Sequence, residues 1–191
     1  MSLHAGFHSS SNIPTRRESI LPTMKLTPHN MVLPISGLGI IFYSPRSVEH
    51  IPPGSNYLRS NYLKSDQVLA HNQKGTIVGF STGSPGTYHL RFHEGDPNDR
   101  SLEVATYKLR LGLHCTDGAV CFRDLYDLIN WRRDCPRKQM VSLDDGFYEV
   151  TLCSSLPASG IIGDDQVIDF HLNRTSELPK LTKSGMPVLC G

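Results

Sequence analysis

The sequence predicts a mainly β protein, built as an antiparallel β-sandwich or a flattened barrel with one short helix. Three features of the 191 residues lead to this fold class: short apolar runs recur along the chain, glycine-containing turns separate them, and several runs alternate between apolar and polar residues. A period of two places every second side chain on the same face of a strand. About seven or eight such strands fit two packed sheets.

The first half of the chain contains several expected strands. Residues 37–45 are expected to form a strand, and 46–65 a loop or a single helical turn, because this stretch is rich in Pro, Asn and Gly. Residues 66–71 and 75–81 are expected to pair as a hairpin. Residues 87–93 alternate, and their apolar face consists of Tyr88, Leu90 and Phe92.

The clearest alternation lies at 106–115, where every second residue is apolar. Asp117-Gly118 is typical of a tight turn, so we expect the chain to return as a neighbouring strand of the same sheet. Each inward position of the first strand would then face an apolar partner, which would set the register. The expected pairs are Val120 with Cys115 and Phe122 with Leu113.

The alternation breaks at 123–131, where a short helix with Asp124 as its N-cap is expected. Alternation returns at 147–154 and 167–172, which predicts the last two strands. The helix is indicated by apolar residues three and four apart, namely Leu125, Leu128 and Ile129.

The chain divides into three expected parts. Residues 1–24 are rich in Ser, His and Pro and predict a disordered extension, residues 25–175 predict the β-sandwich domain, and residues 176–191 a C-terminal tail. No stretch of 18 apolar residues occurs, so no membrane partner is expected. The run after Arg16 and Arg17 is too short for a signal peptide, which favours a cytoplasmic protein.

The five cysteines have no CxxC spacing, and their number is odd. This pattern argues against a disulfide framework and against a zinc site. We therefore expect reduced thiols in a reducing compartment. The residues concerned are Cys115, Cys121, Cys135, Cys153 and Cys190.

The net charge of +1 hides an uneven distribution. Residues 1–85 contain 7 Lys or Arg and 3 Asp or Glu, residues 86–177 contain 10 and 15, and residues 178–191 contain 2 and none. These segments therefore carry +4, −5 and +2. The acidic middle segment suits a basic partner, because complementary charge speeds association. Its alternative role is to keep the protein soluble.

No catalytic residue and no metal or cofactor site is predicted. His89 and His93 share a strand face but lie roughly 13 Å apart at the usual rise per residue, too far for one ion. Cys153 and His171 lie on outward positions of late strands and are the remaining catalytic pair to consider; a half-buried thiol is the alternative meaning of such a cysteine. Basic and aromatic residues do not interleave on any strand face, so direct nucleic-acid binding is not expected.

The candidate partner-binding residues are acids and aromatics in the irregular segments and beside the late strands. Tyrosine and tryptophan anchor many protein interfaces, and acids would steer a basic partner. In the alternative interpretation, Trp131 and Tyr126 close the end of the sandwich and the acids cap turns. The candidates are Asp124, Tyr126, Asp127, Trp131, Asp144, Asp145, Glu149, Asp164, Asp165 and Asp169.

Two stretches, LRLGLHCTDGAVCFRDLYDLINW and DDGFYEVTLCSSLPASGIIGDDQVIDFHL, resemble a family of small bacterial β-sandwich proteins that includes the competence nuclease inhibitor, competence protein J. The matched elements are Asp117-Gly118, Arg123-Asp124-Leu125, 145–148 and 159–165, and they cover less than half of the chain. The resemblance implies a nuclease inhibitor, or the immunity protein of a secreted antibacterial toxin such as those of type VI secretion. No individual site residue is assigned from this resemblance.

Our first hypothesis is a cytoplasmic immunity protein, without enzymatic activity, that occludes the active site of a cognate nuclease toxin through an acidic surface. The second is an enzyme of unrecognised type that uses His89, His93 or the pair Cys153 and His171. The third is a structural or ligand-binding module of a secretion system.

Overall fold

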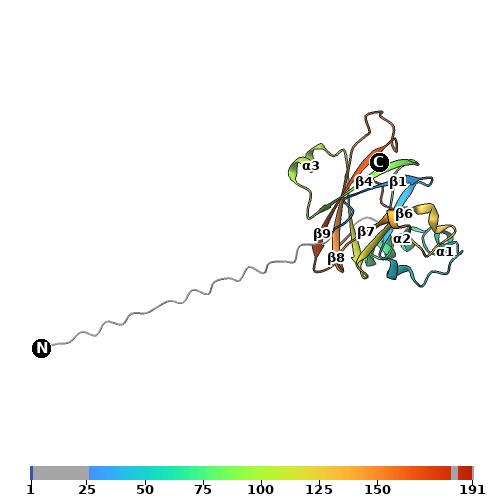
Figure 1. Ribbon diagram of the computed structural model, residues 1–191, viewed down its shortest axis with the longest axis horizontal. Helices are drawn as coiled ribbons and strands as arrows, with labels where there is room; N and C mark the ends of the chain where they lie inside the picture. The colour runs from blue at the N-terminus through green and yellow to red at the C-terminus, as the bar shows by residue number, and fades with distance from the viewer. Residues whose placement is uncertain (2–25, 182–184, 191) are drawn as a thin grey trace.

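The computed structural model describes residues 1, 26–181 and 185–190, so most of the expected extension at 1–24 lies outside the described residues. Two β-sheets pack against each other (Figure 1), which confirms the predicted mainly β, sandwich-like fold. Five strands form one sheet in the order β1-β4-β9-β8-β5, and four form the other in the order β3-β2-β6-β7.

The strands of the larger sheet are β1 (Asn30–Ile35), β4 (Gly86–Glu94), β9 (Gln166–Thr175), β8 (Gly146–Ser154) and β5 (Tyr107–Cys115). The strands of the smaller sheet are β3 (Val78–Ser81), β2 (Gly39–Tyr43), β6 (Ala119–Asp124) and β7 (Met140–Ser142). All neighbouring pairs are antiparallel except β4 and β9, which run parallel. The sheets are therefore mostly antiparallel, as expected, with one parallel pair that the sequence did not predict.

Short helices cover both outer faces. The α-helices are α1 (Tyr57–Asn61), α2 (Ser65–Lys74) and α3 (Asp99–Val104), and the 3-10 helices are η1 (Pro45–Val48), η2 (Leu125–Leu128) and η3 (Arg137–Gln139). Helices α1 and α2 lie against the smaller sheet, where Tyr57, Tyr62 and Val68 join its outward-facing apolar residues in a second core. The prediction of one short helix is thus too low for the described part of the chain.

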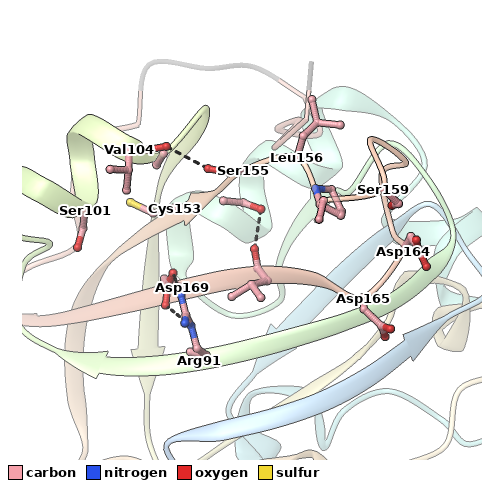
Figure 2. Close-up of a pocket in the computed structure, with 15 residues that line it drawn as sticks. Arg91, Ser101, Val104, Cys153, Ser155, Leu156, Ser159, Asp164, Asp165 and Asp169 are labelled. Atoms are coloured by element: carbon pink, nitrogen blue, oxygen red, sulfur yellow. Dashed lines mark hydrogen bonds and ion pairs between the residues drawn. The ribbon is translucent and has the colours of Figure 1, made fainter.

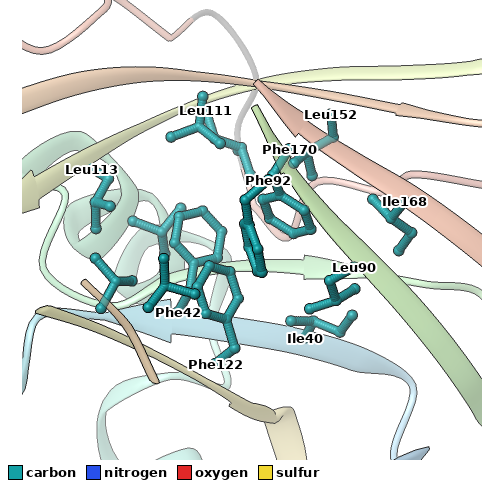
Figure 3. Close-up of a cluster of buried hydrophobic side chains, with 14 of the residues drawn as sticks. Ile40, Phe42, Leu90, Phe92, Leu111, Leu113, Phe122, Leu152, Ile168 and Phe170 are labelled. Carbon is teal, nitrogen blue, oxygen red and sulfur yellow. The ribbon is translucent and has the colours of Figure 1, made fainter. Parts of the chain in front are cut away.

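The main core lies between the two sheets. Its centre is a group of four aromatic rings, Phe42, Phe92, Phe122 and Phe170, whose centroids lie 4.9 to 5.8 Å apart in the contacting pairs (Figure 3). The rings come from both sheets, and edge and tilted arrangements of this kind are favoured by the charge distribution of aromatic rings. The alternation seen in the sequence at β4, β5, β8 and β9 is therefore the alternation of core and surface positions.

The expected hairpin between 106–115 and 119–122 is wrong. Strand β5 pairs with β8, with Cys115 opposite Gly146, whereas β6 belongs to the other sheet. The turn is anchored to the smaller sheet by Asp117, whose carboxylate accepts hydrogen bonds from the Ser44 hydroxyl and the Arg46 amide. Two strands that face each other across a core show the same apolar alternation as two paired strands, so the pattern could not distinguish them.

The expected hairpin of 66–71 with 75–81 is also wrong, because its first half is helix α2. At its start, the Gln67 side chain accepts a hydrogen bond from the amide of Lys64 at 3.0 Å. At its end, Gly75 adopts the left-handed conformation with φ 61°. These are normal start and stop interactions of a helix. Only β3 remains of the predicted pair.

The segment after β9 is part of the folded structure as far as it is described. The Ser81 amide donates to the carbonyl of Pro187 at 2.7 Å, and the Leu189 amide donates to the Ser81 carbonyl at 2.9 Å. Leu189 and Cys190 are buried in the main core. The chain end therefore runs along β3 and covers its edge.

The prediction of five reduced cysteines is wrong for one pair, because Cys121 and Cys135 form a disulfide. Cys121 faces away from the main core, and the segment after η2 returns Cys135 to it, 14 residues later. Sequence spacing alone could not show this return. Cys115, Cys153 and Cys190 are free and buried. No helix in the described ranges is long and apolar enough to cross a membrane.

Candidate functional site

A pocket of about 540 Å³ lies on the outer face of the larger sheet (Figure 2). Its floor is formed by β4, β8 and β9, and its walls by α3 and the segment 155–165. The Ser155 hydroxyl donates to the Val104 carbonyl at 3.1 Å, which joins the two walls at one end. We call this the sheet pocket.

The floor of the sheet pocket carries an ion-pair network. Arg91 donates to both carboxylate oxygens of Asp169, at 2.7 and 2.6 Å, and His93 Nε2 lies 2.7 Å from Asp169 Oδ1. Burial acts to raise the pKa of Asp169, but the hydrogen bonds from Arg91 and His93 outweigh it, so the pKa lies below its ordinary value. Asp169 is therefore ionised and already paired.

Cys153 lies beside Asp169, its register partner, at the base of the pocket. Burial, together with the Asp169 charge, raises the pKa of the Cys153 thiol. The thiolate is the nucleophilic form of cysteine, so this environment favours the unreactive thiol. The register places His171 opposite Thr151 rather than Cys153.

His171 stacks on His93 with ring centroids 4.7 Å apart. Burial, and then the neighbouring His93, lower the pKa of His171. Its Nε2 atom is buried and has no hydrogen-bond partner within the described ranges. In the part of the chain that the structure describes, neither Cys153 nor His171 has the hydrogen-bonded partner that activates a catalytic pair in other proteins.

Two exposed acids stand at one end of the sheet pocket. Asp165 is 74% exposed at its side chain and its Oδ1 lies 3.1 Å from His89 Nε2, while Asp164 precedes it at the surface. Asp165 has φ 49°, a left-handed conformation that aspartate tolerates better than most residues. The loop is held by Gly163, whose carbonyl accepts the amide of Thr87 at 2.8 Å. The acids are therefore presented on a fixed backbone.

Exposed apolar side chains stand around the same pocket. Val104 in α3 is 68% exposed, and Leu156 and Ile161 in the opposite wall are 46% and 63% exposed. Large apolar side chains grouped at the surface and rimmed by polar groups are typical of protein interaction sites. Strand alternation could not predict these residues, because they lie in a helix and a loop. The signal available was the apolar stretch 156–162 between two polar strand ends.

The structure brings only three of the candidate partner-binding residues to the sheet pocket, namely Asp164, Asp165 and Asp169. Glu149 lies elsewhere on the outer face of the sheet and forms an ion pair with Arg110. Asp144 and Asp145 precede β8, where Asp145 Oδ1 accepts the amide of Gly118 at 2.7 Å. This contact is the turn-stabilising role that the alternative interpretation assigned to such acids.

The group at 124–131 divides into buried and exposed members. Trp131 is fully buried and Asp124 is 8% exposed, so neither side chain is presented at the surface of the described structure. The Asp124 carboxylate accepts the amides of Ser36, Gly37 and Tyr126 at 2.7, 2.9 and 2.9 Å. Tyr126 and Asp127 remain accessible at the surface.

The histidines considered for a metal site have other partners. His89 and His93 bond to Asp165 and Asp169, respectively. Within the described ranges, no group of three His, Cys, Asp or Glu side chains is arranged to hold a metal ion.

No protein-family model and no curated protein matches this sequence. Two solved structures resemble the fold. The crocagin biosynthetic gene J product has a TM-score of 0.50 and 13% identity, over 78% of this chain and 97% of its own. ComJ from Bacillus subtilis, described as the inhibitor of the DNA-degrading activity of NucA, has a TM-score of 0.42 and 12% identity, over 80% and 98%. The first likeness shows a shared fold.

Proposed function

We propose that this protein binds and inhibits a cognate bacterial toxin, a nuclease, by placing the sheet pocket and its acidic rim against the toxin's active site. The observation that carries the proposal is the combination of exposed apolar walls with the acids Asp164 and Asp165 on a loop whose backbone is bonded to Thr87. A nuclease groove is basic because it holds phosphate, so an acidic surface complements it.

The resemblance of 109–172 to the competence nuclease inhibitor family supports the same function. In the full form of the proposal, the toxin is secreted by a competing cell, for example by type VI secretion, and the inhibitor is an immunity protein. Nucleic acid is the toxin's substrate, so the two proteins would meet in the cytoplasm.

The test is an inhibition assay with the nuclease encoded beside this protein. We expect the purified protein to stop degradation of plasmid DNA when it is present at a 1:1 ratio to the nuclease. The DNA is kept in large excess over both proteins, so that binding of the DNA by the inhibitor cannot explain the result. We expect cells that express the toxin to survive when they also express this protein.

The double variant Asp164→Lys/Asp165→Lys should weaken inhibition at least tenfold, because like charges would face the toxin's groove. The matched control is Glu49→Lys/Asp66→Lys, which changes the net charge equally at two exposed acids outside the sheet pocket, one directly after η1 and one in α2. Absence of inhibition, together with a tight homo-oligomer, would instead favour a structural module of a secretion system. An equal loss of inhibition in both double variants would show that the sheet pocket is not the surface that contacts the toxin.

A further inference from the structure

A second charged surface, of opposite sign, lies on the other side of the molecule. The segment 132–138 has the sequence RRDCPRK and contains four basic residues and one acid, a net charge of +3. All five charged side chains are exposed. Figure 1 shows this segment, between β6 and β7, on the side of α1 and α2 and away from α3. We call it the basic loop, and its cations are Arg132, Arg133, Arg137 and Lys138.

The basic loop is held in place by several interactions. The disulfide of Cys135 with Cys121 fixes its middle to β6. Its beginning is fixed by the carbonyl of Arg132, which accepts a hydrogen bond from Arg123 Nη1 at 2.6 Å. Just before it, Trp131 exchanges two backbone hydrogen bonds with the segment 54–55, at 2.8 and 3.0 Å. A loop fixed before binding loses less conformational entropy when a partner binds.

The charges of the basic loop are not neutralised by the rest of the described chain. None of its four cations forms an ion pair within residues 26–181 and 185–190. Within the described residues, the one side-chain hydrogen bond of these cations is that of Arg133, whose Nη2 donates to the Glu49 carbonyl at 3.1 Å, a neutral acceptor. Four like charges within seven residues repel one another, and a polyanion relieves this repulsion.

We propose that the basic loop binds the phosphate backbone of nucleic acid without base specificity. Three of its four cations are arginines, whose planar guanidinium groups bind phosphate through two hydrogen bonds. A lipid surface fits less well, because 132–138 contains no large apolar side chain to enter the membrane. The lack of interleaved basic and aromatic residues on any strand face argues against nucleic-acid binding by the strands, but the basic loop lies outside the strands. The proposal does not depend on toxin inhibition, since the two surfaces lie on different elements.

The experiment measures binding of a fluorescent 20-base-pair DNA to the full chain by anisotropy at 50 and 200 mM NaCl. The logarithm of the affinity falls with the logarithm of the salt concentration with a slope of about −0.9 per neutralised phosphate. If four phosphates are neutralised, affinity should therefore fall by about 150-fold between the two salt concentrations. A variant with Arg132→Gln, Arg133→Gln, Arg137→Gln and Lys138→Gln should lose at least tenfold in affinity at 50 mM.

The matched control carries Arg46→Gln, Arg59→Gln, Lys64→Gln and Lys74→Gln, which removes the same charge from exposed positions in η1, α1 and α2 and the residue before α2. It should retain affinity within about threefold, and thermal unfolding should show that both variants fold. Equal loss in both variants would mean that net charge, not the basic loop, drives binding. Binding to phosphatidylglycerol vesicles but not to DNA, or to neither, would also overturn the proposal. Any of these results leaves the toxin-inhibition assay unaffected.

Discussion

The guanidinium of Arg123 lies over the ring of Trp131, 5.3 Å from the ring centroid, in the interior of the protein. Arg123 is 4% exposed, and its Nε donates to Asp127 at 2.8 Å while its Nη1 donates to the Arg132 carbonyl. One buried cation thus joins β6 to the segment after η2. The same contacts orient Asp127 at the surface and fix the start of the basic loop.

Replacing Arg123 with methionine should destabilise the protein by about 3 kcal/mol. The variant leaves the Arg132 carbonyl and Asp127 without their donor and removes the cation from the Trp131 ring. The lost charge-assisted hydrogen bonds and the lost cation–π contact together cost about this much. Urea unfolding followed by the fluorescence of Trp131, the single tryptophan, measures the change. Arg132→Gln, at an exposed position, should change stability by less than about 0.5 kcal/mol. Equal effects of the two variants would contradict the assigned network.

Asp124→Ala should cost about 3 kcal/mol, because it leaves the buried amide of Gly37 and the part-buried amides of Ser36 and Tyr126 without an acceptor. Asp124→Asn should cost less, since one oxygen remains to accept. Gly37→Ala should also destabilise, because its Cβ would lie 2.4 Å from Asp124 Oδ1 and 2.8 Å from the Tyr126 ring. Chemical denaturation of the three variants tests the order, and an Asn variant as unstable as the Ala variant would argue against hydrogen bonding as the cause.

Because Cys121 and Cys135 form a disulfide, we expect three reactive thiols in the protein denatured without reductant and five in the protein denatured with reductant. Mass spectrometry after alkylation counts them. Cys121→Ser/Cys135→Ser should lower stability by about 3 kcal/mol, the contribution usual for a closed loop of this length. Reductant should destabilise the wild-type protein and leave the variant unchanged.

Thiol trapping in cells reports where the protein works. A protein that acts in the cytoplasm would hold Cys121 and Cys135 reduced, whereas an oxidised pair in freshly trapped cells would place it in an oxidising compartment. The second result would contradict the cytoplasmic part of the proposed function and leave the binding surface itself unaffected.

Stability should fall as the pH drops from about 6.5 to about 4 because of His71. Burial, followed by the charges of His50 and Lys74, lowers the pKa of His71 from 6.5 to about 4. In this window the unfolded chain binds a proton that the folded protein does not bind, so protonation favours unfolding. The contribution is about 2 kcal/mol or less after allowing for solvent screening.

The comparison of wild type with His71→Gln isolates this residue from the other titrating groups. Urea unfolding at pH 7 and at pH 4 should show a smaller loss for the variant, while the exposed His29→Gln should behave like the wild type. An identical pH dependence in all three proteins would show that His71 titrates normally.

The elements with strong local patterns could be predicted from the sequence, and those that depend on distant partners could not. Tyr88, Leu90 and Phe92 alternate with polar residues, and all three are buried as expected. Asp124 begins η2 as the predicted N-cap and accepts the Tyr126 amide. For the sheet pocket, the acids Asp164 and Asp165 were among the candidate residues and remain a proposal. Val104 and Leu156 could not be predicted, because nothing local places α3 beside the segment 155–165.

The sequence by itself determined that the protein is mainly β, because side-chain alternation and turn residues act within a few positions along the chain. Only the tertiary structure decided that β5 pairs with β8, that Cys121 bonds to Cys135, and that acids and cations gather on different elements. These outcomes depend on which surfaces pack together. The free energy of that packing comes from contacts between residues far apart in the chain, which leave no pattern in any short stretch of sequence.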